Sequence, residues 1–302
     1  AFAADLTVGS MDAGVGPGKT FESGDLKTTI KGTVNVGTIL RAQNADPALI
    51  AKTNGGTATA APTVDDGDLN YSKNKPVSSA ASAFIESDTN YRGAGLALSV
   101  YGWYDYTQSR GDVPHGNSAN GYSPDTPLSD QGFAPLAKFS GITLADAYLY
   151  GKADLGGDQS LLMRVGNQVI PWVTPTTING GIEQVNPTNI PARGRAGVTP
   201  EEVRVQTPSL YMKWTASKKL SFDAFYQFFF NSNVLAGCGT FASFSDYAAP
   251  GCTGLTLGGV LTGAPKTDQQ GMAISVDHAL RQPDQKPDSG QFGFSTNYMI
   301  DR

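Results

Sequence analysis

The sequence predicts an all-β protein: an antiparallel transmembrane β-barrel of the outer-membrane type, or only the N-terminal strands of a larger barrel. Three observations predict this fold. Apolar and polar residues alternate with a period of two over many segments, and short and long connections alternate between those segments. The third is composition, because only 16% of the 302 residues are charged. A soluble enzyme would carry about 25% charged residues.

The alternation is clearest in three segments, 26–40, 96–106 and 220–230. In the first, Leu26 and Ile30 fall on one face and Lys27 falls on the other. Further strands are predicted at 145–155, 161–168, 210–214 and 292–300, with a weaker one inside 69–87. About 9 to 11 tilted residues cross the hydrocarbon layer of a membrane, so most of these segments are long enough to form a membrane wall.

The connections fall into two classes. Tight turns are predicted at 154–159 and 216–219, and 87–93 is a third candidate. Long connections are expected at approximately 41–70, 108–140, 171–206 and 232–289. Short periplasmic turns and long extracellular loops are typical of outer-membrane barrels. No run of about 18 apolar residues occurs, which excludes a helical membrane span.

The N-terminus indicates export. Ala1-Phe2-Ala3 resembles a signal-peptidase recognition site, so residues 1–25 are predicted to be a periplasmic segment after signal cleavage and residues 26–302 the barrel. The expected location is the cell outer membrane, in contact with its lipid and lipopolysaccharide. Eight strands are even in number, but the chain stops at Asp301-Arg302 without a terminal aromatic residue. A larger barrel is therefore expected.

Cys238 and Cys252, the two cysteines, lie in a segment rich in Gly, Ser and Thr. They are predicted to form one disulfide in the largest extracellular loop, as expected in an oxidising compartment. The alternative is two free cysteines.

Aromatic residues gather near the ends of predicted strands, at Tyr101 to Tyr106, Trp172 and Phe225 to Phe230. They are interpreted as a girdle at the outer membrane interface, because amphipathic rings settle at headgroup depth. The alternative is an aromatic core cluster.

The polar face of the predicted wall supplies candidate lumen residues of mixed charge: Lys27, Lys31, Asp105, Asp146, Lys152, Arg164 and Asp223. A strongly selective pore would show rings of a single charge. The connection around 166–195 has neither strand nor helix period. It is either a pore-lining or gating loop in which Glu183, Arg193 and Arg195 meet solute, or an extracellular cap with both arginines solvated.

Catalysis is not expected. The two histidines, His115 and His278, are far apart, and no metal-ligand spacing such as Cys-x-x-Cys or His-Glu-x-x-His occurs. No cofactor, metal site or nucleic-acid partner is predicted.

Several segments resemble the DUF1302 family of proteobacterial proteins, and the resemblance spans roughly Thr20 to Arg302. These segments are Gly166 to Trp172, Ile178 to Pro187, Pro208 to Trp214, Leu220 to Gln227, Cys238 to Asp246 and Pro250 to Cys252. The resemblance implies a longer outer-membrane protein, often encoded beside a periplasmic lipid-carrier-like protein and an inner-membrane hydrophobe pump. It implies no catalytic residues.

The expected function is that of an outer-membrane channel or transporter, with hydrophobic or lipid-like cargo implied by the resemblance. The residues alone permit general porin behaviour equally well. The first alternative is a surface anchor or interaction protein that displays its long loops without transport. An outer-membrane hydrolase is the third class considered.

Overall fold

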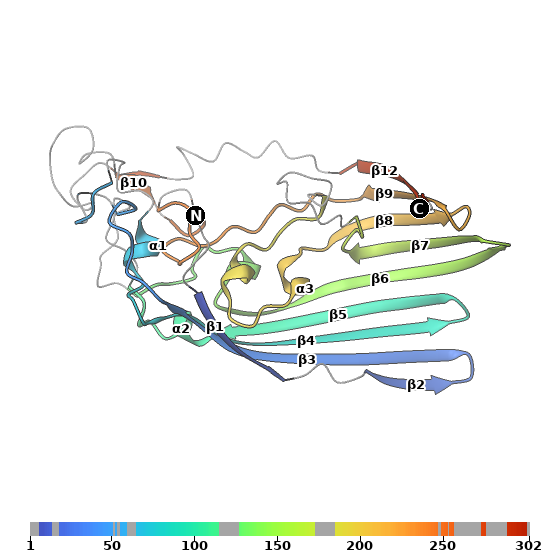
Figure 1. Cartoon of the computed structure of the whole chain (residues 1–302), viewed down its shortest axis with the longest axis horizontal. Coiled ribbons are helices and arrows are strands. Elements are labelled where there is room, and N and C mark those ends of the chain that lie inside the picture. Colours follow the sequence, from blue (N-terminus) through green and yellow to red (C-terminus); the bar gives the residue numbers. More distant parts are fainter. Residues whose placement is uncertain are drawn as a thin grey trace.

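The computed structural model describes residues 6–13, 18–50, 52, 55–58, 65–114, 127–172, 185–246, 249–252, 254–256, 273–275 and 289–300. Its regular structure is mostly β-strand (Figure 1). The strands are β1 Leu6–Ala13, β2 Lys19–Ser23, β3 Leu26–Arg41, β4 Pro76–Tyr91, β5 Ala94–Asp105, β6 Ser140–Gly156, β7 Gln159–Gln168, β8 Thr207–Thr215, β9 Leu220–Gln227, β10 Gly254–Thr256, β11 Ala273–Ser275 and β12 Gln291–Tyr298. The helices are short: α1 Asp66–Leu69, α2 Tyr106–Ser109, α3 Pro200–Val203, and the 3-10 turns η2 Pro135–Ala137 and η4 Pro191–Gly194.

One antiparallel sheet contains ten of the strands, in the order β1-β3-β4-β5-β6-β7-β8-β9-β12, and β2 pairs with β3. β1 pairs with the C-terminal half of β3 and β2 with its N-terminal half. Within the described residues β1 and β12 are the two edges and do not pair with each other, so the sheet is open. The predicted all-β, antiparallel class is confirmed. No helix in the described part of the chain is long and apolar enough to cross a membrane.

All eight predicted strands are present, and the weak one is β4. The periodicity does not predict β1 and β2, which lie inside the predicted N-terminal segment 1–25. Neither alternates between apolar and polar residues for long, and both join the sheet by pairing their backbones with β3. Backbone pairing of this kind leaves little trace in side-chain pattern.

The tight turns lie together at one end of the sheet and the long connections at the other (Figure 1). The predicted turns at 154–159 and 216–219 are confirmed, whereas the candidate turn at 87–93 is shorter than expected. β4 continues to Tyr91, and the chain reverses at Arg92 and Gly93, which have φ of 50° and 88°. Positive φ at both central residues is the geometry that matches strand twist in a hairpin.

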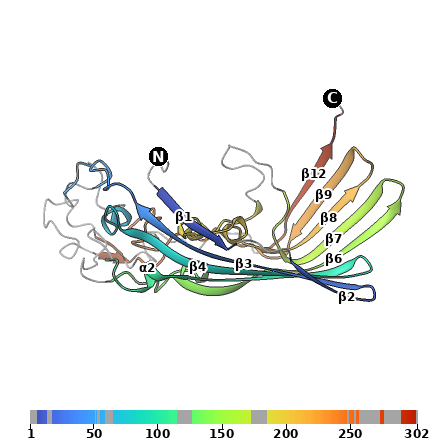
Figure 2. The same ribbon diagram turned by 60° about the horizontal axis from the view of Figure 1, so that its bottom comes forward.

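The two faces of the sheet differ in exposure. Its large apolar side chains are mostly exposed, up to 78% for Ile142. Many residues of the opposite face are buried in the half nearer the long connections, because the sheet curves into a trough and connecting segments pack inside it (Figure 2). Toward the tight turns this face is more exposed, as at Lys27, Lys31 and Lys152. The exposed apolar residues, called the apolar face, include Ile30, Val34, Val36, Ile85, Leu96, Leu98, Ile142, Leu144, Leu149, Met163, Val165, Met212, Phe292 and Phe294.

Some of the aromatic residues predicted to form the girdle are exposed and others are buried, and for the exposed ones the girdle stays a prediction. Tyr104, Tyr226 and Phe229 are exposed, as a girdle requires. Tyr101 and Trp103, only 2% and 5% exposed, instead pack with Phe84 and Ala145 inside the trough. The girdle was therefore the wrong interpretation for these two, because their position in the alternation places them on the polar face.

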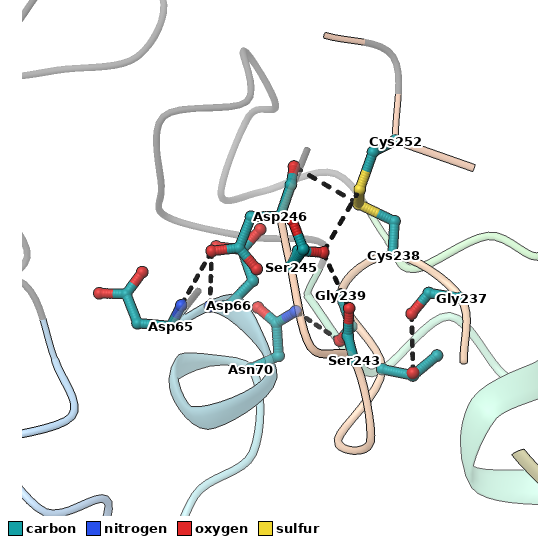
Figure 3. Close-up of a disulfide and its surroundings, with 11 residues drawn as sticks. Asp65, Asp66, Asn70, Gly237, Cys238, Gly239, Ser243, Ser245, Asp246 and Cys252 are labelled. Atoms are coloured by element: carbon teal, nitrogen blue, oxygen red, sulfur yellow. Dashed lines mark hydrogen bonds between the residues drawn. A yellow bond between two sulfur atoms is a disulfide. The ribbon is translucent and has the colours of Figure 1, made fainter. Parts of the chain in front are cut away.

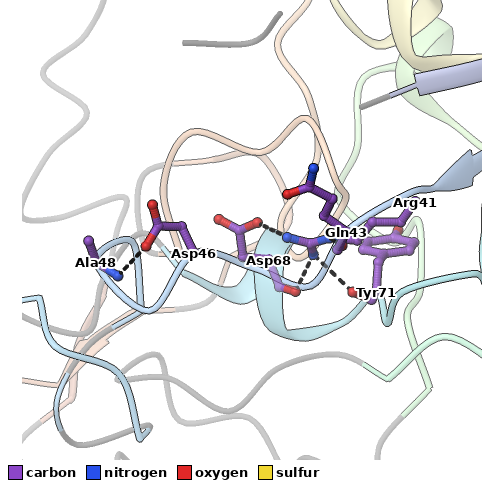
Figure 4. Close-up of polar contacts among 6 residues, drawn as sticks. All are labelled: Arg41, Gln43, Asp46, Ala48, Asp68 and Tyr71. Atoms are coloured by element: carbon purple, nitrogen blue, oxygen red, sulfur yellow. Dashed lines mark hydrogen bonds and ion pairs between the residues drawn. The ribbon is translucent and has the colours of Figure 1, made fainter. Parts of the chain in front are cut away.

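Arg41 fixes the long connection that follows β3 (Figure 4). Its guanidinium donates to the carbonyls of Asp68 and Tyr71 at 2.6 and 2.9 Å and pairs with the Asp68 carboxylate at 2.5 Å. Its Nε donates to the Gln43 carbonyl at 3.0 Å. One buried cation thus satisfies several carbonyls of a connection whose described residues form no strand.

Candidate functional site on the polar face of the sheet

The polar face is the concave side of the sheet. It carries the seven charged residues proposed for a lumen: Lys27, Lys31, Asp105, Asp146, Lys152, Arg164 and Asp223. The register brings them onto one face across β3, β5, β6, β7 and β9. Their role in a lumen stays a prediction.

Two lysines lie on β3, toward its tight-turn end. Lys27 forms an ion pair of 3.2 Å with Glu22, and both side chains are exposed, so the pair contributes little stability. Lys31 pairs in register with Glu86 and lines a hollow that Asp88, Asp146 and Tyr148 also line.

Three carboxylates of this face accept hydrogen bonds from neutral donors. Ser99 Oγ donates to Asp146 Oδ2 at 2.9 Å, and Tyr150 donates its hydroxyl proton to Asp88 Oδ1 at 2.9 Å. Asp223 is buried and accepts from Tyr211 through Oδ1 and from Asn297 Nδ2 through Oδ2, the latter at 2.9 Å. These bonds hold the carboxylates close to the sheet.

Asp105 does not face open space, although sequence alone placed it among the lumen residues. It is buried, accepts from Ser78 Oγ at 2.5 Å, and caps α2 by accepting the Gln108 backbone N–H at 3.3 Å. A carboxylate at a helix N-terminus satisfies otherwise unpaired N–H groups. Asp105 therefore links β4 to α2.

Arg164 lies between two aromatic rings at the centre of β7. Its guanidinium is 5.3 Å from the Tyr148 ring centre and 5.9 Å from that of Tyr211. Lys152 approaches the Tyr150 ring in the same way, at 5.9 Å. Such contacts orient a cation without neutralising it.

Residues 185–206, here called the cover segment, lie inside the trough (Figure 2). The Ala196 N–H donates to Ser78 Oγ at 3.2 Å, and Ser82 Oγ donates to Glu202 Oε1 at 3.1 Å. Ser78 and Ser82 belong to the polar face of β4. The described part of this connection therefore packs against the concave face of the sheet, and a gating role for it stays a prediction.

Arg195 anchors the cover segment and is only 7% exposed. Its guanidinium stacks 4.3 Å from the Trp103 ring centre and donates to the carbonyls of Leu136 and Lys138. Burial lowers the pKa of Arg195 to about 10, which leaves it charged at neutral pH, and Tyr101 and Glu202 partly oppose that shift. Arg193, two residues earlier, is exposed.

Glu202 is the acidic member of this anchor. It is almost fully buried in α3, and burial raises the pKa of its carboxyl, an effect that hydrogen bonds from Ser82 and Thr199 and the charge of Arg195 partly oppose. Glu202 is not among the site residues predicted from the sequence. The pattern Thr199-Pro200-Glu201-Glu202, with Pro at the first helical position and Glu three residues after Thr, is a helix-start signal that would have located α3.

Glu183, His115 and His278 lie outside the described residues. Tyr101, Trp103 and Asn189 are further site residues that the sequence reading did not select. The first two could have been found from their place in the alternation. Asn189 could not, because its contact with the Tyr101 hydroxyl joins positions 88 residues apart.

The predicted disulfide between Cys238 and Cys252 is present (Figure 3). It closes a loop next to α1, where Asp246 accepts the backbone N–H groups of Asp65 and Asp66 at 2.8 and 3.3 Å. The three Asp carboxylates come within 4.8 Å of one another. Asp246 thus joins the disulfide loop to the connection between β3 and β4.

Replacing both cysteines, as Cys238→Ser with Cys252→Ser, is expected to lower the free energy of unfolding by about 3 kcal/mol, because the crosslink spans 14 residues. Urea unfolding measures the change. Wild type treated with reductant is the control and should match the double variant, whereas unchanged stability in both samples would contradict a stabilising role.

A comparison with family models matches residues 1–302, the whole chain, to a family described as a protein of unknown function (DUF1302). Searches of curated proteins and of solved structures found no match.

Proposed function

Since the chain belongs to the DUF1302 family, whose function is unknown, we propose from its structure that the sheet is part of the wall of an outer-membrane β-barrel. The barrel would let solute pass along the polar face, around or past the cover segment. The remaining strands needed for closure would lie beyond the open edges β1 and β12.

The exposed apolar face is the observation that carries this proposal. In a soluble β-protein the apolar face is buried and the polar face is wet, whereas here large residues such as Ile142 and Leu149 are exposed. An apolar patch over many adjacent strands would aggregate in water. Lipid is the solvent that favours its exposure.

The dimensions of the wall support the same proposal. β5 has 12 residues. At about 3.3 Å per residue and a tilt of about 40°, such a strand spans about 30 Å, which equals the thickness of the hydrocarbon layer. Exposed aromatics fall near both ends of the sheet, with Trp214 and Tyr298 at the tight-turn end and Tyr104 and Tyr226 at the other.

The two sheet ends suggest an orientation. Tight turns would face the periplasm and the long connections the exterior, and the disulfide would then lie outside. The cover segment contacts the polar face in the half nearer the long connections, at Ser78, Ser82 and Trp103. It would therefore narrow the outer half of the lumen and leave the periplasmic half open.

For cargo we propose hydrophobic or lipid-like compounds, the class that the family resemblance implies. A periplasmic lipid-carrier-like protein and an inner-membrane hydrophobe pump are the partners proposed on the same basis. General porin behaviour is the nearest competing account, because the polar face carries both signs of charge.

Conductance of the reconstituted full-length protein in planar bilayers tests the proposal. We expect ion current, with a larger unitary conductance when residues 188–204 are replaced by a short Gly-Ser linker. Lys218→Gln is the control, because Lys218 lies in the β8–β9 turn, at the end of the sheet away from the cover segment. Wild type that inserts without any current would overturn passage and favour a surface anchor.

A further inference from the structure

The Arg164 guanidinium has both ring contacts and free hydrogen-bonding capacity. Tyr148 and Tyr211 hold it over their rings, yet within the described part of the chain it makes no hydrogen bond and no ion pair. A guanidinium carries five N–H donors in a rigid, planar fork. Its donors are therefore available to a ligand while its orientation is already set.

Two carboxylates of the same face are held by hydrogen bonds from neutral donors, and neither forms an ion pair with Arg164. Asp146, whose charge acts on Arg164, accepts from Ser99 at 2.9 Å, and Asp223 accepts one hydrogen bond at each carboxylate oxygen. In contrast to Lys27, which pairs with Glu22, Arg164 has no acidic partner within 4.0 Å among the described residues.

Two lysines flank Arg164 on the same face. Leu162 is the register partner of both Lys152 on β6 and Lys213 on β8, one polar-face position from Arg164. Neighbouring strands are about 4.8 Å apart and positions i and i+2 about 7 Å apart, so the backbones at all three cations fall within about 10 Å. On its other side Lys213 is the register partner of Asp223, but neither lysine forms an ion pair within 4.0 Å in the described residues.

We propose that Arg164, Lys152 and Lys213 form a binding site for an oxyanion, in which the Arg164 fork takes a carboxylate or phosphate group by two parallel hydrogen bonds. Bidentate pairing is the preferred geometry between guanidinium and such groups. The inference rests on the proposed function in one respect, namely that solute passes along the polar face. It adds that the cargo carries a negative head.

Titration calorimetry on the detergent-solubilised full-length chain tests the site, with octanoate, benzoate and inorganic phosphate as probes. Arg164→Gln is expected to weaken binding of the preferred probe about tenfold, since a charged hydrogen-bond donor is lost. Arg164→Lys, which keeps the charge and loses the fork, should fall between. Lys218→Gln is the matched control, because it removes one positive charge in the β8–β9 turn, where Lys218 pairs with Asp158.

The probes distinguish the source of the anion. Octanoate bound more tightly than benzoate and phosphate indicates an amphiphile headgroup, whereas tightest binding of phosphate indicates a small inorganic anion. Binding of none of the probes to wild type, or equal binding by Arg164→Gln and wild type, would overturn the site. Calorimetry measures binding independently of conductance. A protein that binds octanoate but conducts no ions would therefore contradict the proposed channel and support the binding site.

Discussion

Replacing Leu149 with Arg is expected to destabilise the reconstituted protein by about 2 to 4 kcal/mol, the cost of a cation on the lipid face at mid-membrane depth. Leu149 is 58% exposed on β6, with Leu96 and Val165 as its neighbours across the sheet. In water the same substitution at so exposed a position would be nearly neutral. Urea unfolding in phospholipid vesicles measures the difference.

Leu155→Arg is the matched control for this prediction. Leu155 lies on the same strand and is 53% exposed, but it falls at the register shift next to the β6–β7 turn. At the membrane interface the cost falls to about 0 to 1 kcal/mol. Equal effects of the two substitutions would contradict a membrane wall, since only a bilayer distinguishes their depths.

The strands could be predicted from sequence because apolar and polar residues alternate within each of them, which identifies the two faces. Leu96 and Leu98 alternate with Ala97 and Ser99, and that pattern survives whatever the strand pairs with. β1 and β2 could not be predicted in this way, because backbone hydrogen bonds to β3 hold them. Closure of the sheet cannot be predicted either, because it depends on pairing between the edge strands and leaves no pattern within any one strand.

The site was predicted only in part, for a related reason. The period-two alternation predicts that Arg164 and Asp146 lie on the polar face. It does not predict that Asp105 is enclosed by α2 and by its hydrogen bonds to Ser78 and Gln108. The cover segment has no period, and its contact from Ala196 to Ser78 joins positions 118 residues apart. Contacts between such distant positions depend on the assembled trough and not on neighbours in sequence.

The second large effect is expected from Arg195→Met. The substitution keeps most of the side-chain volume and removes the stacking on Trp103 and the hydrogen bonds to the Leu136 and Lys138 carbonyls. Together these losses amount to about 3 kcal/mol, which raises the undocked fraction of the cover segment about a hundredfold. Limited proteolysis of the segment and bilayer conductance measure the change, and both should increase.

Arg193→Met is the control, because Arg193 belongs to the same turn, carries the same charge and is exposed. If charge in the lumen governs conductance, both substitutions should alter the conductance similarly, and neither should increase proteolytic cleavage of the cover segment. If docking governs it, only Arg195→Met should act, and it should raise cleavage and current together. Increased cleavage of the cover segment with unchanged current would show that docking of the segment does not control conductance. The cover segment would then be a structural part of the wall and not its constriction.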